Sequence, residues 1–497
     1  MSTAIVIGGG MGGLASAALL GKHGYSVTLL EKNALLGGRA NYFEAEGFRF
    51  DMGPSWYLMP DVFEHFFALM GERVEDHLQL QRLDPSYRIA FRGSDRTVDM
   101  YSDLSRDVAT FEALEPGSGQ ALRDYLGRAE EQYGIAIEQF MYRNHDSMFD
   151  FLDRKTAMQG IALHVFENMH SYISRSFHTD AVQKILEYQL VFLGSSPYAT
   201  PALYNIMSHI DFNLGVFYPQ GGIYSIVRAM AAIGSSHGVQ YRTEAPVAEI
   251  LAEGGRAAGV RVASGEELRA DLVVANADMH HTETELLPKK ARTHSARSWG
   301  RRTLAPSAFI LYLGLKGLVP SLTHHNLGFG QDWRRNFAEI FDSPAWSDDP
   351  SYYVCAPSRT DPTAAPEGHE NLFVLVPVAP GLPMTDADIA TYRRRALDLL
   401  AEDFDVPDVE ERIVFERTYT SRDFTADYNA YGGSALGLAH TMRQTLFRPN
   451  NVSKKLPNLY YVGAGTSPGI GMPICLISAE MVYKRIIGDR RPGPLPV

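Results

Sequence analysis

The chain has little cysteine and tryptophan for its size, and it has no long apolar run. Its 497 residues include two cysteines and four tryptophans. Two cysteines far apart, Cys355 and Cys475, do not suggest a disulfide framework, so the sequence favours a reducing, cytoplasmic compartment. No apolar stretch reaches the roughly 18 residues of a membrane-spanning helix, and the first seven residues show no basic segment of a signal peptide. Any membrane association is therefore expected to be peripheral.

The chain also lacks an excess of positive charge. It has 46 Lys and Arg against 58 Asp and Glu, a net charge of −12, which argues against a nucleic-acid-binding face. The hydrophobic fraction of 45% and the charged fraction of 21% are those of a globular protein and exclude extended disorder. At about 100–200 residues per domain, the length predicts two or three domains or one discontinuous pair.

A glycine-rich loop stands between the first predicted strand, residues 3–7, and the helix that follows. Gly8, Gly10 and Gly13 match the pattern G-x-G-x-x-G. Gly8 permits the tight turn, Gly10 lets the backbone approach a pyrophosphate, and Gly13 lets helix and strand pack closely. Glu31 ends the next predicted strand, about 20 residues further on, where a carboxylate can accept from ribose hydroxyls. This order predicts a dinucleotide-binding βαβ unit and a parallel sheet.

The rest of the chain divides into a helical middle and returning strands. Apolar residues recur at helical spacing over 120–144, and methionine and aromatic residues crowd 148–177. Two further buried strands are predicted at 271–275 and 459–463, with a helix over about 474–487. We therefore expect the middle to be inserted between parts of the nucleotide domain.

The residues just after Glu31 add a second signal. Gly37-Gly38-Arg39 is not required by a simple nicotinamide-binding unit. An arginine at this place can neutralise a diphosphate through charge-assisted hydrogen bonds, although an exposed surface arginine is the simpler interpretation of Arg39 alone.

Residues 8–13, Glu31 and 37–39 together resemble the FAD-binding N-terminus shared by amine oxidases, protoporphyrinogen oxidase and carotenoid desaturases. Residues 458–472 (NLYYVGAGTSPGIGM) resemble the signature of the bacterial-type phytoene and carotenoid desaturases. The same family resemblance extends over about residues 3–487 and includes four shorter motifs at residues 51–55, 218–222, 360–368 and 447–449. Departures at Ser421, Ser467 and 473–478 indicate a difference in substrate or product rather than in cofactor.

The resemblance implies an α/β protein (α+β overall) with a discontinuous Rossmann-like FAD-binding domain, a β-meander and an inserted mixed substrate domain with a helical apolar part. The FAD-binding domain would comprise 1–95, 218–292 and 448–497, and the substrate-binding, membrane-facing domain 96–217 and 293–447. Amides of the C-terminal glycine loop are expected to stabilise the reduced flavin. The expected FAD contacts are Gly8, Gly10, Met11, Gly12, Gly13, Glu31, Lys32, Gly38, Arg39, Pro54, Ser55, Val247, Gly463, Gly465, Gly471 and Met472.

The implied activity is FAD-dependent desaturation of a carotenoid precursor, phytoene towards neurosporene or lycopene, by hydride transfer from an allylic position to flavin N5. No second strand–GxGxxG–helix unit is present, so a quinone or oxygen rather than NAD(P)+ is the expected electron acceptor. Four alternatives stay open within related flavoenzymes and one outside them: a diapocarotenoid desaturase, a 3,4-desaturase, a carotenoid isomerase, an amine oxidase, and a non-redox prenyl-binding protein such as a Rab GDP-dissociation inhibitor.

An apolar polyene substrate requires a long apolar tunnel. The residues proposed to line it, for each of which a packed core is an equal alternative, are those of 148–177 with Val191, Phe192, Tyr204, Phe212 and Phe217. The resemblance also implies contact with the inner face of the membrane, where the polyene resides. The basic residues proposed for that contact, with a solvated helix surface as the alternative, are Arg143, Arg154, Lys155, Arg175 and Lys184.

The sequence assigns no catalytic base and no metal site. His209 and Asp211 are candidate proton acceptors, but a structural role explains them better. Two neighbouring pairs, His280–His281 and His324–His325, suggest metal ligands. Neighbouring side chains point apart in a strand, and no cysteine or carboxylate spacing accompanies the pairs, so no metal is expected.

Overall fold

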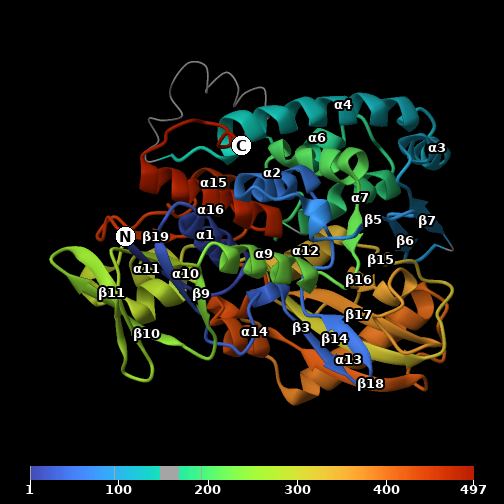
Figure 1. Ribbon diagram of the computed structural model, residues 1–497. Coiled ribbons are helices and arrows are strands. Elements are labelled where there is room, and N and C mark those ends of the chain that lie inside the picture. Colours follow the sequence, from blue (N-terminus) through green and yellow to red (C-terminus); the bar gives the residue numbers. More distant parts are fainter. Residues whose placement is uncertain (1, 95, 146–166, 192) are drawn as a thin grey trace.

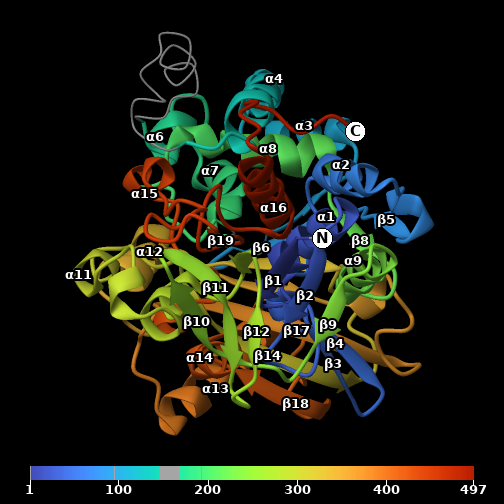
Figure 2. The same ribbon diagram turned by 60° about the vertical axis from the view of Figure 1, so that its left-hand side comes forward.

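Two large sheets, three smaller ones and a layer of helices make up the fold, which a computed structural model describes for residues 2–94, 96–145, 167–191 and 193–497 (Figure 1). The first sheet has five parallel strands in the order β19-β13-β1-β2-β9. Their bounds are β1 (Thr3–Ile7), β2 (Ser26–Leu30), β9 (Gln240–Arg242), β13 (Leu272–Ala275) and β19 (Leu459–Tyr461). Because β13 pairs with both β1 and β19, the two ends of the chain meet in one sheet (Figure 2).

Alternate residues of β1 face two different layers. Ala4 and Val6 pack against helices, whereas Ile5 and Ile7 pack against a three-stranded antiparallel meander. The helices are α1 (Met11–Lys22), α9 (Tyr224–Ser236) and α16 (Met472–Ile487), and the meander is β10 (Val247–Glu253), β11 (Arg256–Val262) and β12 (Glu267–Arg269). Both faces of the parallel sheet are thus covered, which explains its nearly continuous apolar strands.

The second sheet has seven strands in the order β18-β14-β17-β16-β15-β6-β7. All neighbours are antiparallel except β15 and β6. Its strands are β6 (Tyr87–Phe91), β7 (Thr97–Met100), β14 (Ser307–Lys316), β15 (His325–Phe329), β16 (Tyr352–Cys355), β17 (His369–Val378) and β18 (Ile413–Tyr419). One face buries Leu397 and Leu400 of α13 (Asp386–Asp403), and the other faces the helical layer.

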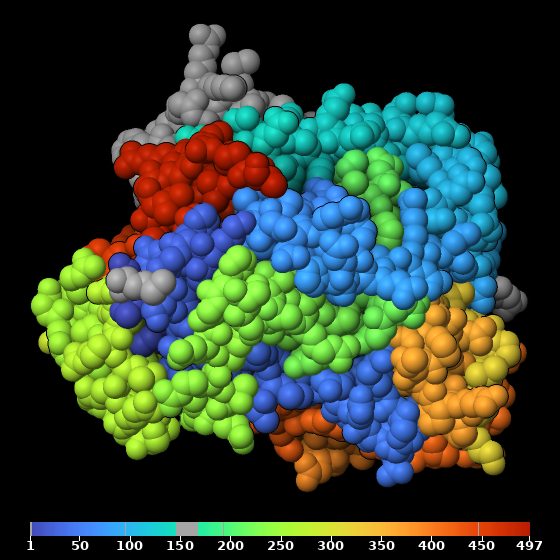
Figure 3. All heavy atoms as spheres, viewed as in Figure 1, coloured from blue at the N-terminus to red at the C-terminus, as the bar shows by residue number. Residues whose placement is uncertain are grey.

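The helical layer lies along one side of the molecule and contacts the C-terminal helix (Figures 1 and 3). It contains α2 (Pro60–Met70), α3 (Leu104–Leu114), α4 (Ser118–Ala136), α6 (Met169–Ile173), α7 (Asp180–Glu187) and α8 (Ile206–Ser208). The other described strands and α-helices are β3 (Tyr42–Ala45), β4 (Phe48–Asp51), β5 (Leu80–Arg82), β8 (Phe217–Pro219), α10 (Met279–His281), α11 (Ala296–Trp299), α12 (Trp333–Phe341), α14 (Ser421–Tyr428) and α15 (Met442–Leu446).

The observed elements agree with the expected fold class and differ in detail. The helix expected over 120–144 is α4 followed by a π-helical turn, Ile137–Met141. The proposed boundary at residue 95 falls inside the β6–β7 hairpin of the seven-stranded sheet. Much of the apolar segment 148–177 lies outside the described residues. Among the helices that are described, none combines the length and the apolar character needed to cross a membrane.

Candidate active site

One cavity of about 1010 Å³ runs from the glycine loop to the apolar face of the seven-stranded sheet. We call its first part the nucleotide compartment; its wall includes Gly8, Gly10, Glu31, Arg39 and Val247. We call its second part the apolar compartment. The wall of the apolar compartment is made by Ala308, Ile310, Leu327, Phe329, Trp333, Phe337, Ile340, Phe373, Leu375 and Pro377.

The glycine loop holds the start of α1 against the end of β1. Gly8 has φ +98°, a backbone conformation that residues with a side chain rarely adopt. A Cβ added at Gly13 would lie 2.0 Å from the Gly8 carbonyl oxygen. Only glycine therefore permits this approach of helix and loop. Helix α1 begins at Met11 without a side-chain cap at Gly10. Its first amides and the positive end of its dipole are thus available to an anion in the cavity.

Glu31 fixes the loop and leaves acceptor capacity for a ligand. Its side chain is 5% exposed, and its two oxygens accept from the backbone N–H groups of Gly9 (2.7 Å) and Asn33 (2.9 Å). An ionised carboxylate has about four lone-pair positions, so positions remain for hydroxyl donors. Lys32, the next residue, directs its Nζ to the carbonyl oxygen of Ala426 (2.6 Å) and also lines the cavity.

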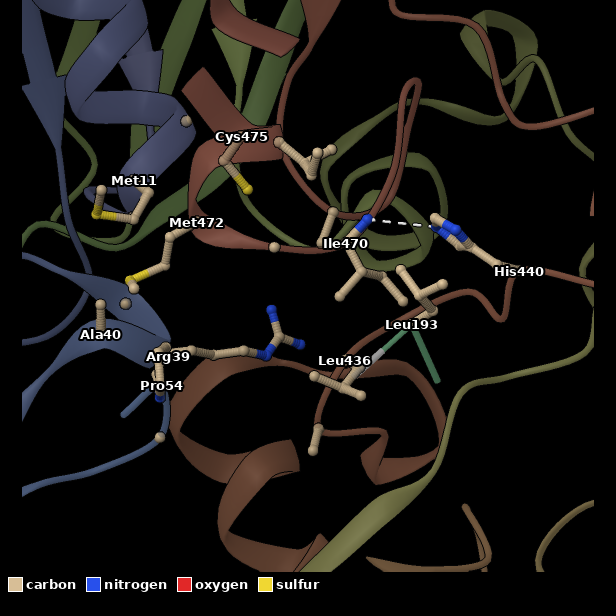
Figure 4. Close-up of a pocket in the computed structure, with 18 of the residues that line it drawn as sticks. Met11, Arg39, Ala40, Pro54, Leu193, Leu436, His440, Ile470, Met472 and Cys475 are labelled. Atoms are coloured by element: carbon tan, nitrogen blue, oxygen red, sulfur yellow. Dashed lines mark hydrogen bonds between the residues drawn. The ribbon is translucent and has the colours of Figure 1, made fainter. Parts of the chain in front are cut away.

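Arg39 places an incompletely satisfied cation in the cavity. Its side chain extends across the pocket towards Ile470 and Leu436 (Figure 4). The Nη2 group has a long contact of 3.5 Å to the Ser434 carbonyl oxygen, and the buried Nε has no hydrogen-bond partner. A buried N–H group without a partner is costly. These donors therefore fit an anionic or carbonyl-bearing ligand such as FAD.

A second helix N-terminus opens onto the same cavity. Helix α16 begins at Met472 after Gly471, whose φ is +124°, and Pro473 stands in its first turn. Both Gly471 and Met472 line the cavity. Helices α1 and α16 pack against each other, so residues from the two ends of the chain present amides to one ligand site.

The cavity brings together most of the residues expected to bind FAD. Those that line it are Gly8, Gly10, Met11, Gly12, Glu31, Lys32, Gly38, Arg39, Pro54, Ser55, Val247, Gly471 and Met472. Gly13 instead contacts Gly8 behind the loop. The Gly463 N–H donates to Ser478 Oγ (3.1 Å), which ties α16 to β19. Gly465 lines a small adjoining hollow beside Met279.

The sequence analysis missed His440 as a residue of the cavity wall. Burial and the nearby Arg448 cation lower the pKa of His440 well below its usual value, so the imidazole is neutral. Its Nε2 accepts from the Ile470 N–H (3.4 Å; Figure 4), and its buried Nδ1 has no partner. No motif surrounds His440 in the sequence, and only the fold places it beside the loop before α16.

The expected tunnel lining is partly wrong. Val191 and Tyr204 line the cavity, whereas other proposed residues pack elsewhere in the hydrophobic interior. These are Met169, Tyr172, Phe177, Phe212 and Phe217. The apolar face of α6 and α7 is used to pack against α4 and the sheet, so β14, β15, β17 and α12 supply much of the cavity wall instead. Phe192 lies outside the described residues.

The polar candidates outside the cavity have structural roles. Asp211 accepts from Tyr87 (2.8 Å), Tyr188 (2.9 Å) and Gln189 (2.8 Å), and burial raises its pKa to about 6. His209 contacts Asn213 (2.9 Å). Neither His209 nor Asp211 lines the cavity.

The proposed basic docking face also changes. Lys184 is buried and donates to the carbonyl oxygens of Gly330 (3.0 Å) and Gln331 (2.9 Å), so it is wrong to assign it to a surface. Arg175 is exposed and pairs with Glu167, and Arg143 lines the cavity. The two remaining residues, Arg154 and Lys155, lie outside the described part of the chain.

Comparison with known proteins identifies the family. The sequence pattern of the flavin-containing amine oxidoreductases matches residues 11–487. The chain is 48% identical to a carotenoid 3,4-desaturase of Haloarcula japonica, over 97% of this chain and 98% of that protein. It is 38% identical to a zeta-carotene-forming phytoene desaturase of Myxococcus xanthus, over 97% and 93%. The chain belongs to the carotenoid desaturase family.

Members of this family are FAD-dependent oxidoreductases, and the expected family, fold class and cofactor are confirmed. The crystal structure of an oxidoreductase from Methanosarcina mazei shares the fold, with a TM-score of 0.64 and 19% identity over 97% of this chain and 100% of that one. The glycine cradle, Glu31 and the unsatisfied Arg39 donors fit FAD. The contacts of individual residues with FAD stay predictions.

Proposed function

We propose that this protein desaturates a carotenoid chain. The observation that carries the proposal is that one cavity joins the nucleotide compartment to the apolar compartment. Its volume of about 1010 Å³ stands at the upper end of the roughly 300–1,000 Å³ usual for ligand sites. A dinucleotide in the first compartment would thus adjoin a space suited to an extended hydrocarbon.

The wall of the apolar compartment favours a hydrocarbon over an amine. Among its described residues none carries a charged side chain, and Trp333, Phe337 and Ile340 of α12 face this space. A cationic amine would lose its hydration there without a carboxylate to replace it. This argues against the amine oxidase alternative, although the family pattern is named for amine oxidoreductases.

The residues around the cavity would position the substrate and exclude water. When bound, FAD supplies two-electron oxidation by accepting a hydride. The hydrogens of a polyene are not acidic, so correct placement of the chain matters more than a strong base. His440 is neutral, and burial raises the pKa of the Cys475 thiol to about 11. These uncharged groups would keep the wall near Arg39 compatible with an apolar chain.

Two desaturation positions are candidates. The 48% identity to a carotenoid 3,4-desaturase favours the 3,4 position. The 38% identity to a zeta-carotene-forming phytoene desaturase supports phytoene, the substrate expected from the sequence, as the second candidate. Because the apolar compartment presents the same kind of apolar surface to either chain, both hydrocarbon substrates suit its wall.

Product analysis tests the proposal. The FAD-loaded enzyme is incubated in liposomes with phytoene and, separately, with lycopene, in which the central chain is already desaturated but the 3,4 bond is not. The products are separated and their masses are measured by mass spectrometry. Loss of two hydrogens from the second compound alone is the expected result. Conversion of phytoene alone would support the second candidate. Oxidation of amines with no change in either carotenoid would contradict the proposal.

We also propose peripheral membrane contact and a quinone or oxygen as electron acceptor. An apolar substrate resides in the bilayer, so the enzyme must take it from there. Flotation with liposomes and anaerobic turnover with added quinone measure the two points separately. Failure to float, or efficient transfer of electrons to NAD(P)+, would remove the corresponding proposal.

A further inference from the structure

Three potential metal ligands lie together behind the wall of the cavity. They are His324, His325 and Cys355, and none is more than 4% exposed. One ring nitrogen of each histidine and Cys355 Sγ all lie within 4.8 Å of one another. The three residues do not line the cavity themselves, and the function proposed above does not use them.

The strand pairing explains how the cluster forms. His325 and Cys355 are direct cross-strand partners of β15 and β16, so their side chains share one face of the sheet. His324 precedes β15, and its ring centroid lies 4.5 Å from that of His325. The expectation that these neighbouring histidines point apart is wrong, because the first of them stands outside the regular strand. The cysteine was missed because it comes 30 residues later in the chain.

The hydrogen bonds of the imidazoles leave one nitrogen of each available. His324 Nδ1 lies 2.8 Å from Thr360 Oγ1, and His325 Nδ1 lies 2.7 Å from the Tyr353 hydroxyl. The Nε2 atoms of both rings are buried and have no hydrogen-bond partner. A metal-bound histidine usually shows this arrangement, with its second nitrogen held by an outer group. Two buried ring nitrogens left unpaired would otherwise destabilise the fold.

We propose that His324, His325 and Cys355 form a binding site for a thiophilic divalent metal ion, Zn²⁺ in the first instance. Two imidazoles and a thiolate are ligands that zinc prefers, and they disfavour magnesium and calcium, which take oxygen ligands. On binding, the Cys355 thiol loses its proton to solvent and the sulfur forms a bond to the ion. No oxidation or reduction is involved.

The buried surroundings keep both imidazoles neutral. Burial lowers the pKa of His324 to about 3 and that of His325 well below its usual value, so both rings are neutral and able to coordinate. Burial, with the Asp51 carboxylate as a smaller cause, raises the pKa of Cys355 to about 12, so the thiol keeps its proton until an ion displaces it.

The ion would strengthen one wall of the cavity. Trp56 stacks on His325 with ring centroids 4.0 Å apart, and Ser55 Oγ lies 2.7 Å from the Tyr353 hydroxyl. Both Ser55 and Trp56 line the cavity. Metal binding would thus fix His325 and Tyr353 and, through them, this segment of wall. The role is structural and does not depend on which substrate is oxidised.

Metal content of the purified full-length protein tests the proposal. The protein is stripped with a chelator, reloaded with Zn²⁺ and dialysed, and bound zinc is measured by elemental mass spectrometry. We expect one ion per chain, a higher melting temperature in the loaded state, and loss of the ion in Cys355→Ala and in His324→Gln. The matched control is His280→Gln, which alters the other neighbouring histidine pair and should keep the ion.

Two further measurements test the site even if Cys355→Ala or His324→Gln does not fold. Thr360→Val keeps the shape of the side chain but removes the outer hydroxyl, and we expect zinc affinity to fall about 10–100-fold. Co²⁺ in place of Zn²⁺ should give visible d–d bands, at longer wavelength than flavin absorption, typical of a thiolate-bound tetrahedral ion. The proposal is overturned if the reloaded unaltered protein holds no zinc, or if folded Cys355→Ala keeps one ion per chain.

Discussion

Replacement of Gly13 by alanine should separate helix α1 from the glycine loop. The added Cβ would lie 2.0 Å from the Gly8 carbonyl oxygen, whereas ordinary van der Waals contact begins at 3.4 Å. The obstacle is backbone, so the start of α1 must retreat by about 1.4 Å. Such overpacking costs about 1–3 kcal/mol of stability. The same shift would break at least one amide hydrogen bond to the FAD diphosphate, worth about 1.5–3 kcal/mol.

The expected result is a dissociation constant for FAD that rises about 10–100-fold, since 1.4 kcal/mol corresponds to a factor of ten. Titration of flavin-free protein with FAD, followed by flavin fluorescence, measures it, and thermal unfolding without FAD measures the packing cost. The control is Gly127→Ala in α4, where an added Cβ has nothing within 4 Å and should raise helix stability by up to about 1 kcal/mol. Unchanged FAD affinity in Gly13→Ala would refute the argument.

Three other changes test separate parts of the site. Arg39→Met should weaken FAD binding about 10–100-fold, because it removes the unsatisfied donors that face the cavity; unchanged affinity in the titration would count against that role. Ala308→Trp should fill part of the apolar compartment and stop carotenoid turnover while FAD affinity stays within about twofold, and undiminished turnover would place the substrate elsewhere. Burial raises the pKa of Asp51 from 3.8 to about 6, so the folded chain retains a proton that the unfolded chain loses; the free energy of unfolding should fall by up to about 3 kcal/mol as pH rises from about 4 to 6. Urea unfolding of Asp51→Asn should show a shallower fall over that range, and an identical slope would disprove the assignment.

The nucleotide part of the fold could be predicted because its signals are local. Gly8, Gly13 and Glu31 lie within one βαβ unit, and each occupies a position that the backbone or a nearby amide requires. The C-terminal strand and helix were found through their apolar pattern and the loop before Met472. These features depend on neighbours in sequence, or on a strand that must be buried on both faces.

The remaining parts depend on contacts between distant segments. His440 reaches the cavity only because the loop before α16 folds beside it. Met169 and Phe177 have the composition of a tunnel wall, but composition does not distinguish a residue facing a cavity from one facing another helix. Cys355 joins His324 and His325 through a strand pairing that no local pattern reveals.

The central claim is that the two ends of the chain bind one FAD, through the N-termini of α1 and α16. Amide hydrogen exchange with and without FAD tests it most directly. FAD should slow exchange together at residues 8–13 and at 471–475, with the same dependence on FAD concentration, and should leave α13 unchanged. Protection confined to residues 8–13, with exchange at 471–475 unaffected by saturating FAD, would contradict the claim.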